Sequence, residues 1–299
     1  MFSPMLTNEF ADIVLQRARL RRIVGQRFLR NPTFFLGAVI FVGFLFFCFA
    51  GPILDRASPL TIHLNVVGQP PSARWPLGTD ELGRNELTRL MYGGRLILLI
   101  GLVSAVTATV LGLWAGVMSG VYGGAIDRVL SWTMDVVSSV PQLVPLLLFE
   151  VLVGTSPLTM IVVVAATSWP FVGRPVRVEV MSLCTREFVM AAESMGTSRR
   201  RIILRHLLPN LWPTLLTSVS TCVGTAILVI ATASFLGFNL PPPYPDWGSM
   251  IAQGMSGLYD GYWWLITLPG ACIVLVQLAL NLMGDAVRDG VDSQPEVRV

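Results

Sequence analysis

Charged residues are scarce in this sequence. Only 13% of its 299 residues are Asp, Glu, Lys or Arg, whereas 53% are hydrophobic. A soluble domain carries about 25% charged residues, so this chain cannot cover an ordinary water-facing surface. Lysine is absent, and all 21 basic residues are arginine. The arginines form clusters separated by apolar runs of membrane length, which argues against a nucleic-acid-binding surface.

Residues that hold metals or perform catalysis are also few. The two histidines, His63 and His206, lie far apart, and no two cysteines have C-x-x-C spacing. We therefore expect no metal or redox site and interpret the cysteines as small buried hydrophobic residues. Neither an H-E-x-x-H motif nor a G-x-x-x-x-G-K-[ST] phosphate loop occurs. The chain is thus neither an intramembrane metalloenzyme nor, by itself, an ATPase.

Six apolar segments are long enough to cross a membrane as helices. A span needs about 20 residues, because each residue adds about 1.5 Å across a hydrocarbon core about 30 Å thick. The segments are 33–53, 95–118, 129–149, 156–173, 212–236 and 262–283. They predict an all-α membrane protein with an N-terminal segment 1–32, a six-helix transmembrane domain 33–283 and a C-terminal tail 284–299.

The arginines predict the orientation of these spans. Six of them precede the first span and seven lie in the 174–211 loop, whereas the 237–261 loop has none. Basic residues concentrate on the cytoplasmic side of membrane proteins. We therefore expect both termini and the 174–211 loop to be cytoplasmic and the 54–94 loop to be external. The arginines ahead of the first span, with no cleavage site after it, indicate a retained anchor rather than a secretory signal.

A stripe of small residues marks one face of the second span. Its members recur every four residues: Ala108, Gly112, Gly116 and Gly120. Such stripes let helix backbones approach closely in membranes. We expect this face to pack against another helix.

The segment 186–209 predicts a short surface helix followed by a second one. Its apolar residues follow i, i+3, i+4, i+7 spacing and are Phe188, Ala191, Ala192 and Met195. Gly196 can end this helix because glycine adopts the left-handed conformation without strain. Thr197 or Ser198 can cap the second helix. The small Ala191 and Ala192 would let the first helix sit deep in a groove of a partner protein.

This segment resembles the EAA loop of ABC importer permeases, through Ala191-Ala192, Gly196 and Leu208-Pro209. In that family the loop forms a coupling helix that docks into an ATPase subunit. Met190 stands where the motif has glutamate, and Glu187 and Glu193 lie on either side. The resemblance implies that the coupling residues are Glu187, Phe188, Met190, Ala191, Ala192, Glu193, Met195, Gly196, Leu208 and Pro209.

Three further motifs narrow the resemblance. Residues 75–84 read W-P-L-G-T-D-E-L-G-R and are similar to the P-L-G-T-D-x-x-G-R-D signature of dipeptide, oligopeptide and nickel importer permeases, with Asn85 replacing the last aspartate. Residues 234–248 resemble the S-F-L-G…P-E-W-G segment of the same permeases, and residues 281–289 match N-L-x-G-D-x-x-R-D. Together the motifs resemble the C-type permease of a heterodimeric pair.

The external signature loop contains Gly78, Thr79, Asp80, Gly83 and Arg84. We expect Gly78 and Gly83 to permit tight turns, and Thr79 or Asp80 to cap the following helix. Asp80 is close enough in sequence to pair with Arg84. We interpret the loop as a structural brace rather than a ligand site. In the 234–248 segment, we expect Trp247 to anchor the chain at the membrane interface.

The resemblance implies a type I ABC importer permease fold in the cytoplasmic (inner) membrane of a prokaryote. The chain would form half of a translocation path for peptides or similar small solutes and would need no cofactor of its own. Implied partners are a second permease, two ATP-binding subunits that use ATP and Mg, an external solute-binding protein and membrane lipid. The residues that line the path are not identified.

An ion- or proton-coupled secondary transporter is the alternative. Such proteins place carboxylates or histidines deep in the bilayer. Here only Asp135 and Glu150 lie near the third span, both towards its ends, and the fifth and sixth spans contain no ionisable residue. These positions favour the importer.

Overall fold

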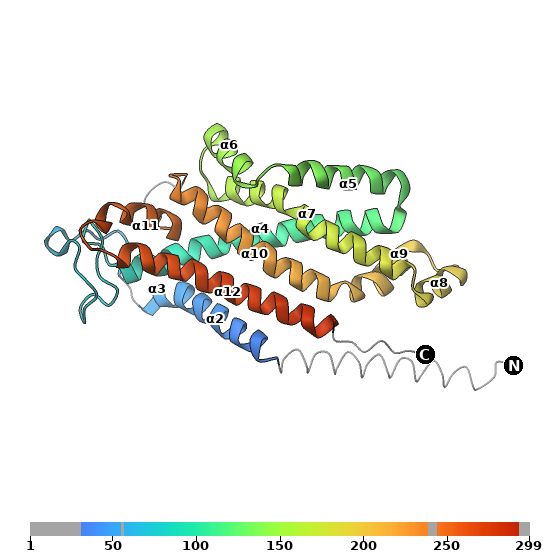
Figure 1. Ribbon diagram of the computed structural model, residues 1–299, viewed down its shortest axis with the longest axis horizontal. Coiled ribbons are helices and arrows are strands. Elements are labelled where there is room, and N and C mark those ends of the chain that lie inside the picture. Colours follow the sequence, from blue (N-terminus) through green and yellow to red (C-terminus); the bar gives the residue numbers. More distant parts are fainter. Residues whose placement is uncertain (1–30, 55–56, 239–243, 293–299) are drawn as a thin grey trace.

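The computed structural model describes residues 31–54, 57–238 and 244–292 as an elongated bundle of helices (Figure 1). Most of the N-terminal segment, the prolines at 241–243 and the end of the tail lie outside the described residues. The longer helices are α2 (Pro32–Phe49), α4 (Glu86–Tyr122), α5 (Gly124–Ser139), α6 (Leu143–Val153), α7 (Pro157–Cys184), α10 (Trp212–Phe235) and α12 (Trp264–Asp292). The short ones are α3 (Gly51–Leu54), α8 (Glu187–Ser194), α9 (Arg199–Ile202) and α11 (Trp247–Gly254).

Side-chain caps fix several helix starts. Asn85 accepts a hydrogen bond from the backbone N–H of Leu87, and Ser156 accepts one from the N–H of Thr159. Such caps satisfy amide groups that have no partner within the helix. The cap of α4 is therefore Asn85, and the expectation that Thr79 or Asp80 would provide it was wrong.

Five described helices are long and apolar enough to cross a membrane, and the third predicted span, 129–149, is instead a pair of helices with a break between them. In place of a single helix over 129–149, α5 and α6 meet at an angle of 79°. Figure 1 shows α6 turned away from the line of α5. Pro141 lies in the break, and Pro145 lies in the first turn of α6, where its missing N–H costs no helical hydrogen bond.

Two spans extend further than their apolar cores indicated. Helix α4 begins at Glu86 rather than 95, and α7 continues past 173 to Cys184. The end of the external loop and the start of the 174–211 loop are therefore helical. The charged residues in these extensions form contacts within the chain, as described below.

The small-residue stripe of α4 packs against α7, as predicted. A Cβ added at Gly112 would lie 2.6 Å from the carbonyl oxygen of Trp169, and one at Gly116 would lie 2.7 Å from that of Gly173. Ala108, in the same stripe, is fully buried. The absence of side chains therefore brings the two helices into backbone contact.

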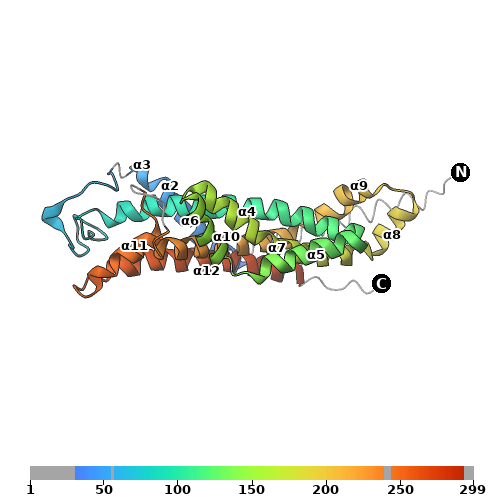
Figure 2. The same cartoon turned by 90° about the horizontal axis from the view of Figure 1, so that it is seen from above.

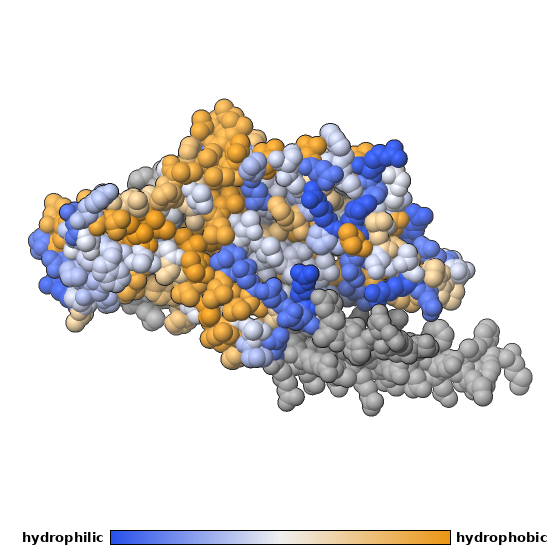
Figure 3. All heavy atoms as spheres, in the orientation of Figure 1, coloured by the Kyte–Doolittle hydropathy of each residue, from blue (hydrophilic) through white to orange (hydrophobic). Residues whose placement is uncertain are grey.

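The two ends of the bundle differ. The 57–85 loop and α11 lie at one end, and α8 and α9 project from the other (Figures 1 and 2). Hydrophobic side chains gather over α6 and the neighbouring middle part of the bundle, whereas both ends show more hydrophilic surface (Figure 3). This distribution fits a membrane-spanning bundle with a polar region at each end.

Candidate functional site

Helix α8 ends in a cap that requires glycine. Gly196 has φ of +75°, in the left-handed region. Its N–H donates to the carbonyl of Glu193 at 2.9 Å, and the N–H of Thr197 donates to the carbonyl of Ala192 at 3.0 Å. These two bonds form a Schellman motif, which turns the chain sharply out of a helix. The predicted role of Gly196 in ending the helix is confirmed.

The two sides of α8 have different roles. Val189 and Ala192 are buried, and Val189 belongs to the same apolar cluster as Ile202 and Leu207. The expectation that Ala192 would face a partner was therefore wrong, because it packs against its own chain. Sequence reasoning also missed Val189, although its spacing of three residues from Ala192 is the helical signal for a shared face.

An apolar surface on α8 points away from the bundle. Met190 is 48% exposed and Met195 is 74% exposed, and Ala191 between them is also exposed. Glu187 and Glu193 are exposed at either end of the helix. Methionine side chains adapt their shape to a partner, so this surface suits protein contact. We call Met190, Ala191 and Met195 the α8 outer face.

The chain returns to the bundle through two short turns that are not α-helical. Helix α9 continues into a π-helical turn, η2 (Ile203–Leu207), and a 3-10 turn, η3 (Leu208–Asn210). Ser198 occupies the cap position of α9 without a side-chain cap bond, so only the predicted place of the cap is correct. Leu208 is half-buried and Pro209 is exposed.

Two side-chain contacts connect the α8 region with the rest of the protein. The ring of Phe188 lies against that of His206 on η2, with their centroids 6.2 Å apart. The guanidinium of Arg199 lies 5.5 Å from the ring centroid of Tyr122, at the end of α4. Cations over aromatic rings attract the ring electrons. The first contact therefore holds α8 to η2, and the second holds α9 to the end of the spanning helix α4.

Polar contacts connect α5 to α7 at the same end of the bundle. The guanidinium of Arg177 donates to the Asp127 carboxylate, with Nη2–Oδ2 at 2.7 Å, and its Nε donates to Ser119 at 3.2 Å. Further along, Arg174 pairs with Asp135 at 2.9 Å. Met134 is the one buried residue of α5. The two ion pairs therefore provide much of the attachment of α5 to α7. Asp135 therefore has a partner within the chain.

The external signature loop forms a network around Asp80. Its carboxylate pairs with Arg84 at 2.6 Å, as predicted, and with buried Arg89 at 2.7 Å. Both guanidinium groups also donate to Gln253 on α11, at 3.2 and 2.8 Å. Thr79 donates through Oγ1 to the carbonyl of Val66 at 2.5 Å. The loop is a brace that connects the start of α4 to α11.

Glycines and tryptophans complete this brace. Gly78 and Gly83 have φ of +81° and +69°, so both adopt the turn conformation expected of them. Trp247 is fully buried and donates through Nε1 to the carbonyl of Leu90 at 2.9 Å. Trp264 is also buried and donates to the carbonyl of Thr79 at 3.2 Å. The prediction that Trp247 lies at the membrane interface was wrong, because it fills the core beneath the loop.

No group of three or more metal-binding side chains occurs within the described ranges. The four cysteines are unpaired, with Cys48 and Cys222 buried and Cys184 and Cys272 half-buried. Cys48 and Cys222 belong to the apolar core, and Cys184 and Cys272 pack against it, as expected of small hydrophobic residues.

Comparison with known proteins shows what this architecture is. Residues 108–295 match the family of binding-protein-dependent transport system inner membrane components. The chain is 34% identical over 274 residues to a putative peptide permease protein of Brucella suis, covering 91% of both chains. It is 35% identical over 262 residues to the probable D,D-dipeptide transport system permease protein DdpC of Escherichia coli, covering 88% of both.

A further sequence relative and a solved structure are also similar to this chain. The oligopeptide transport system permease protein OppC of Bacillus subtilis is 31% identical over 300 residues, covering 100% of this chain and 97% of that protein. An inward-facing structure of the MetNI methionine ABC transporter matches with a TM-score of 0.55 at 24% identity, covering 67% of this chain and 95% of the other. The chain therefore belongs to the family of binding-protein-dependent transport system inner membrane components and is a permease subunit of an ABC importer.

Proposed function

We propose that this permease imports peptides and that the α8 outer face is its docking surface for an ATP-binding subunit. The observation that carries the docking role is the exposure of Met190, Ala191 and Met195 on a helix fixed from behind by buried Val189 and Ala192. Peptide as the substrate is supported by the relatives, which are named as peptide, D,D-dipeptide and oligopeptide permeases.

The chemistry of the surface indicates its partner. Exposed charges of both signs lie near the outer face: Glu187 and Glu193 on α8, Arg186 at its start, and Arg199, Arg200 and Arg201 on α9. A partner groove with an apolar floor and a rim that carries both signs of charge would complement this arrangement. Met190, which replaces the glutamate of the EAA motif, would contribute apolar contact instead of a charged hydrogen bond.

The contacts behind the docking surface provide a route for movement. A displacement of α8 and α9 would reach α4 through Arg199 and Tyr122 and η2 through Phe188 and His206. The pairing of Asp127 with Arg177 would carry it to α5. ATP-driven closure of the ATP-binding subunits would thereby change the arrangement of the spans.

The complete importer would contain two ATP-binding subunits that use ATP and Mg, a second permease and an external solute-binding protein. Both termini and α8 would be cytoplasmic, in the inner membrane of a prokaryote. The alternative of an ion-coupled transporter is disfavoured by the family to which the chain belongs. It is also disfavoured by the pairing of Asp135 with Arg174.

Gly196→Val in the reconstituted importer tests the docking role. A non-glycine residue in the left-handed conformation costs about 1–2 kcal/mol, and β-branching makes it worse. The turn after α8 would therefore shift and misdirect the outer face. We expect ATP hydrolysis to continue while peptide uptake falls at least tenfold.

Gly237→Val is the matched control. Gly237 ends α10 with φ of +95° and the same pair of hydrogen bonds, from its own N–H to Ser234 and from Phe238 to Ala233. At neither glycine would a Cβ meet another atom within 4 Å, so both variants suffer the same backbone strain without a steric clash. Equal uptake by the two variants would contradict the docking role of α8.

A further inference from the structure

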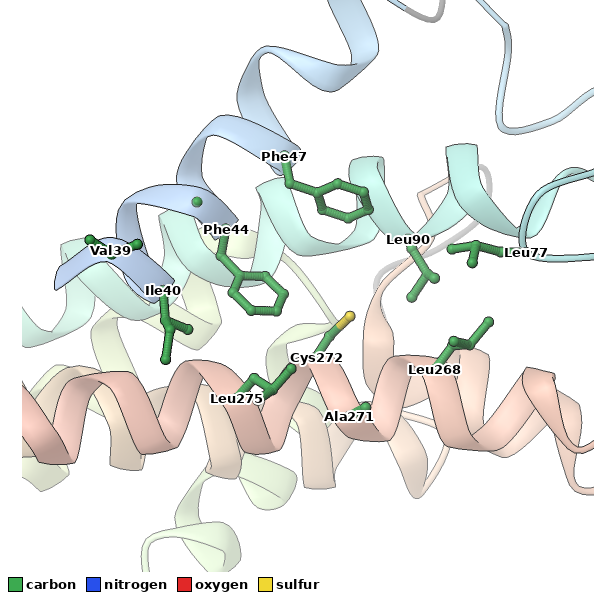
Figure 4. A pocket seen from close by; sticks show the side chains of 11 residues that line it. Val39, Ile40, Phe44, Phe47, Leu77, Leu90, Leu268, Ala271, Cys272 and Leu275 are labelled. Carbon is green, nitrogen blue, oxygen red and sulfur yellow. The ribbon is translucent and has the colours of Figure 1, made fainter. Parts of the chain in front are cut away.

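An apolar groove lies between α2 and α12, with α4 as its floor (Figure 4). Its volume is about 440 Å³. The side chains that define it are Phe44 and Phe47 on α2, Leu90 on α4, and Leu268, Cys272 and Leu275 on α12. None of the lining residues is charged. The groove is separate from the α8 region, and Leu77 of the external signature loop also lines it.

Contacts at both ends of α2 keep the groove open. Near the start of α2, a Cβ at Gly37 would lie 2.6 Å from the carbonyl oxygen of Ala279, so α2 touches α12 there. Near its end, buried Cys48 lies against Gly94 of α4. Between these contacts, a Cβ at Gly43 would meet nothing within 4 Å. The helix therefore bridges the groove and cannot collapse into it without losing one of its contacts.

The dimensions and lining restrict what can fill the groove. On α2 it extends from Val39 to Phe47, a rise of about 12 Å. Its lining residues are apolar, so an occupant with unpaired polar groups is disfavoured. An extended peptide would leave its amide groups without hydrogen-bond partners among these side chains, which disfavours it.

The surroundings supply an occupant of suitable chemistry. Val42 and Phe46, on the outer side of the same helix, are 60% and 64% exposed. They lie on a helix that is long and apolar enough to cross a membrane, and the same helix forms one wall of the groove. An empty groove would leave its walls without van der Waals partners on one side, whereas a hydrocarbon chain restores them.

We propose that the groove between α2 and α12 is a binding site for one acyl chain of a membrane phospholipid. The chain would lie along Phe44 and Phe47 on one side and Leu268 and Leu275 on the other, in contact with Leu90. It would be retained longer than the lipid around the bundle, because protein encloses it on three sides. It would also support α2 around Gly43, where an added Cβ would meet no protein atom within 4 Å.

Photolabelling tests the site in the purified full-length protein within its complex. The probe is phosphatidylethanolamine with a diazirine near the end of one acyl chain, incorporated into nanodiscs, irradiated and mapped by mass spectrometry of peptides. We expect label on Phe44, Phe47 and Leu275 at several times the level found on exposed Val274 of α12. Gly43→Phe should reduce the groove label at least fivefold.

Val42→Phe is the matched control, because it adds the same ring to the adjacent, exposed position and should leave the label within twofold of wild type. Ala271→Phe fills the groove from the opposite wall and should act like Gly43→Phe, which guards against misfolding of one variant. Uniform labelling of all exposed positions, unchanged by either filling variant, would overturn the proposal. So would labelling of the groove residues in the wild-type protein at no more than the level of Val274. The assay does not depend on docking or transport and therefore stands apart from the proposed function.

Discussion

Asp80→Asn is expected to destabilise the protein through the brace at the loop end of the bundle. Oδ1 of Asp80 accepts the backbone N–H groups of Leu82 and Arg84, at 2.9 and 2.8 Å. Oδ2 accepts from the side chains of Arg84 and Arg89, at 2.6 and 2.7 Å. Asparagine can preserve the Oδ1 bonds, but it removes the charge and replaces Oδ2 by a donor that faces two guanidinium groups.

The magnitude follows from the burial of the pair. The side chains of Asp80 and Arg89 are 10% and 4% exposed. Removing one partner of a buried ion pair costs about 3–5 kcal/mol, because the remaining charge is poorly compensated. Gln253 still accepts a hydrogen bond from each arginine, so we expect the lower end, about 3 kcal/mol. For a protein of this size that corresponds to a fall in Tm of roughly 6 °C.

Thermal unfolding of the purified protein in mild detergent, followed by tryptophan fluorescence, measures the effect. Asp260→Asn is the control, because Asp260 is exposed at the same end of the bundle and should change Tm little. In a double-mutant cycle with Arg89→Met, the double variant should be more stable than the sum of the single effects predicts. Equal Tm values for Asp80→Asn and Asp260→Asn would refute the brace.

Two further outcomes follow from helix packing. Gly116→Ala should lower Tm, because a Cβ there would lie 2.7 Å from the α7 backbone and overpacking costs about 1–3 kcal/mol. Gly43→Ala should maintain or raise Tm, because a Cβ at Gly43 meets no atom within 4 Å and alanine stabilises a helix by about 1 kcal/mol relative to glycine. An equal fall in both would contradict the packing assigned to the α4 stripe. Asp127→Asn should accelerate hydrogen exchange in α5 because it weakens the pairing with Arg177, whereas unchanged exchange would show that other contacts hold α5.

Features that depend on neighbouring residues could be predicted from the sequence. The left-handed conformation of Gly78, Gly83 and Gly196 follows from glycine beside short helical patterns, and each has positive φ. The pairing of Asp80 with Arg84 spans only one helical turn of sequence. Apolar length likewise predicted five of the six spans, and small-residue spacing predicted the close packing of α4.

Features that depend on distant residues could not be predicted in this way. Gln253 belongs to the network around Asp80 but lies 169 residues after Arg84 in the sequence, so no local pattern relates them. Tryptophan is a residue type typical of membrane interfaces, yet Trp247 is buried in the core, where its indole N–H donates to the carbonyl of Leu90. Ala192 differs from Ala191 only in the direction it faces, which the packing of Val189 decides.

The break between α5 and α6 shows a related limit. The apolar run over 129–149 predicted one span, whereas the chain turns by 79° between α5 and α6, where Pro141 lies. The angle depends on how α5 pairs through Asp127 and Asp135 with α7, and so on tertiary contacts. Apolar length alone therefore predicted neither the break nor its geometry.

Site-specific photo-cross-linking from the α8 outer face tests the central claim most directly. A benzophenone side chain would be introduced at Met195 in one protein and, as the control, at Tyr259, which is 96% exposed in the loop between α11 and α12. In intact membranes we expect Met195 to cross-link to an ATP-binding subunit and Tyr259 not to do so. Cross-linking of the ATP-binding subunit from Tyr259 but not from Met195 would contradict the account, as would its absence from both positions.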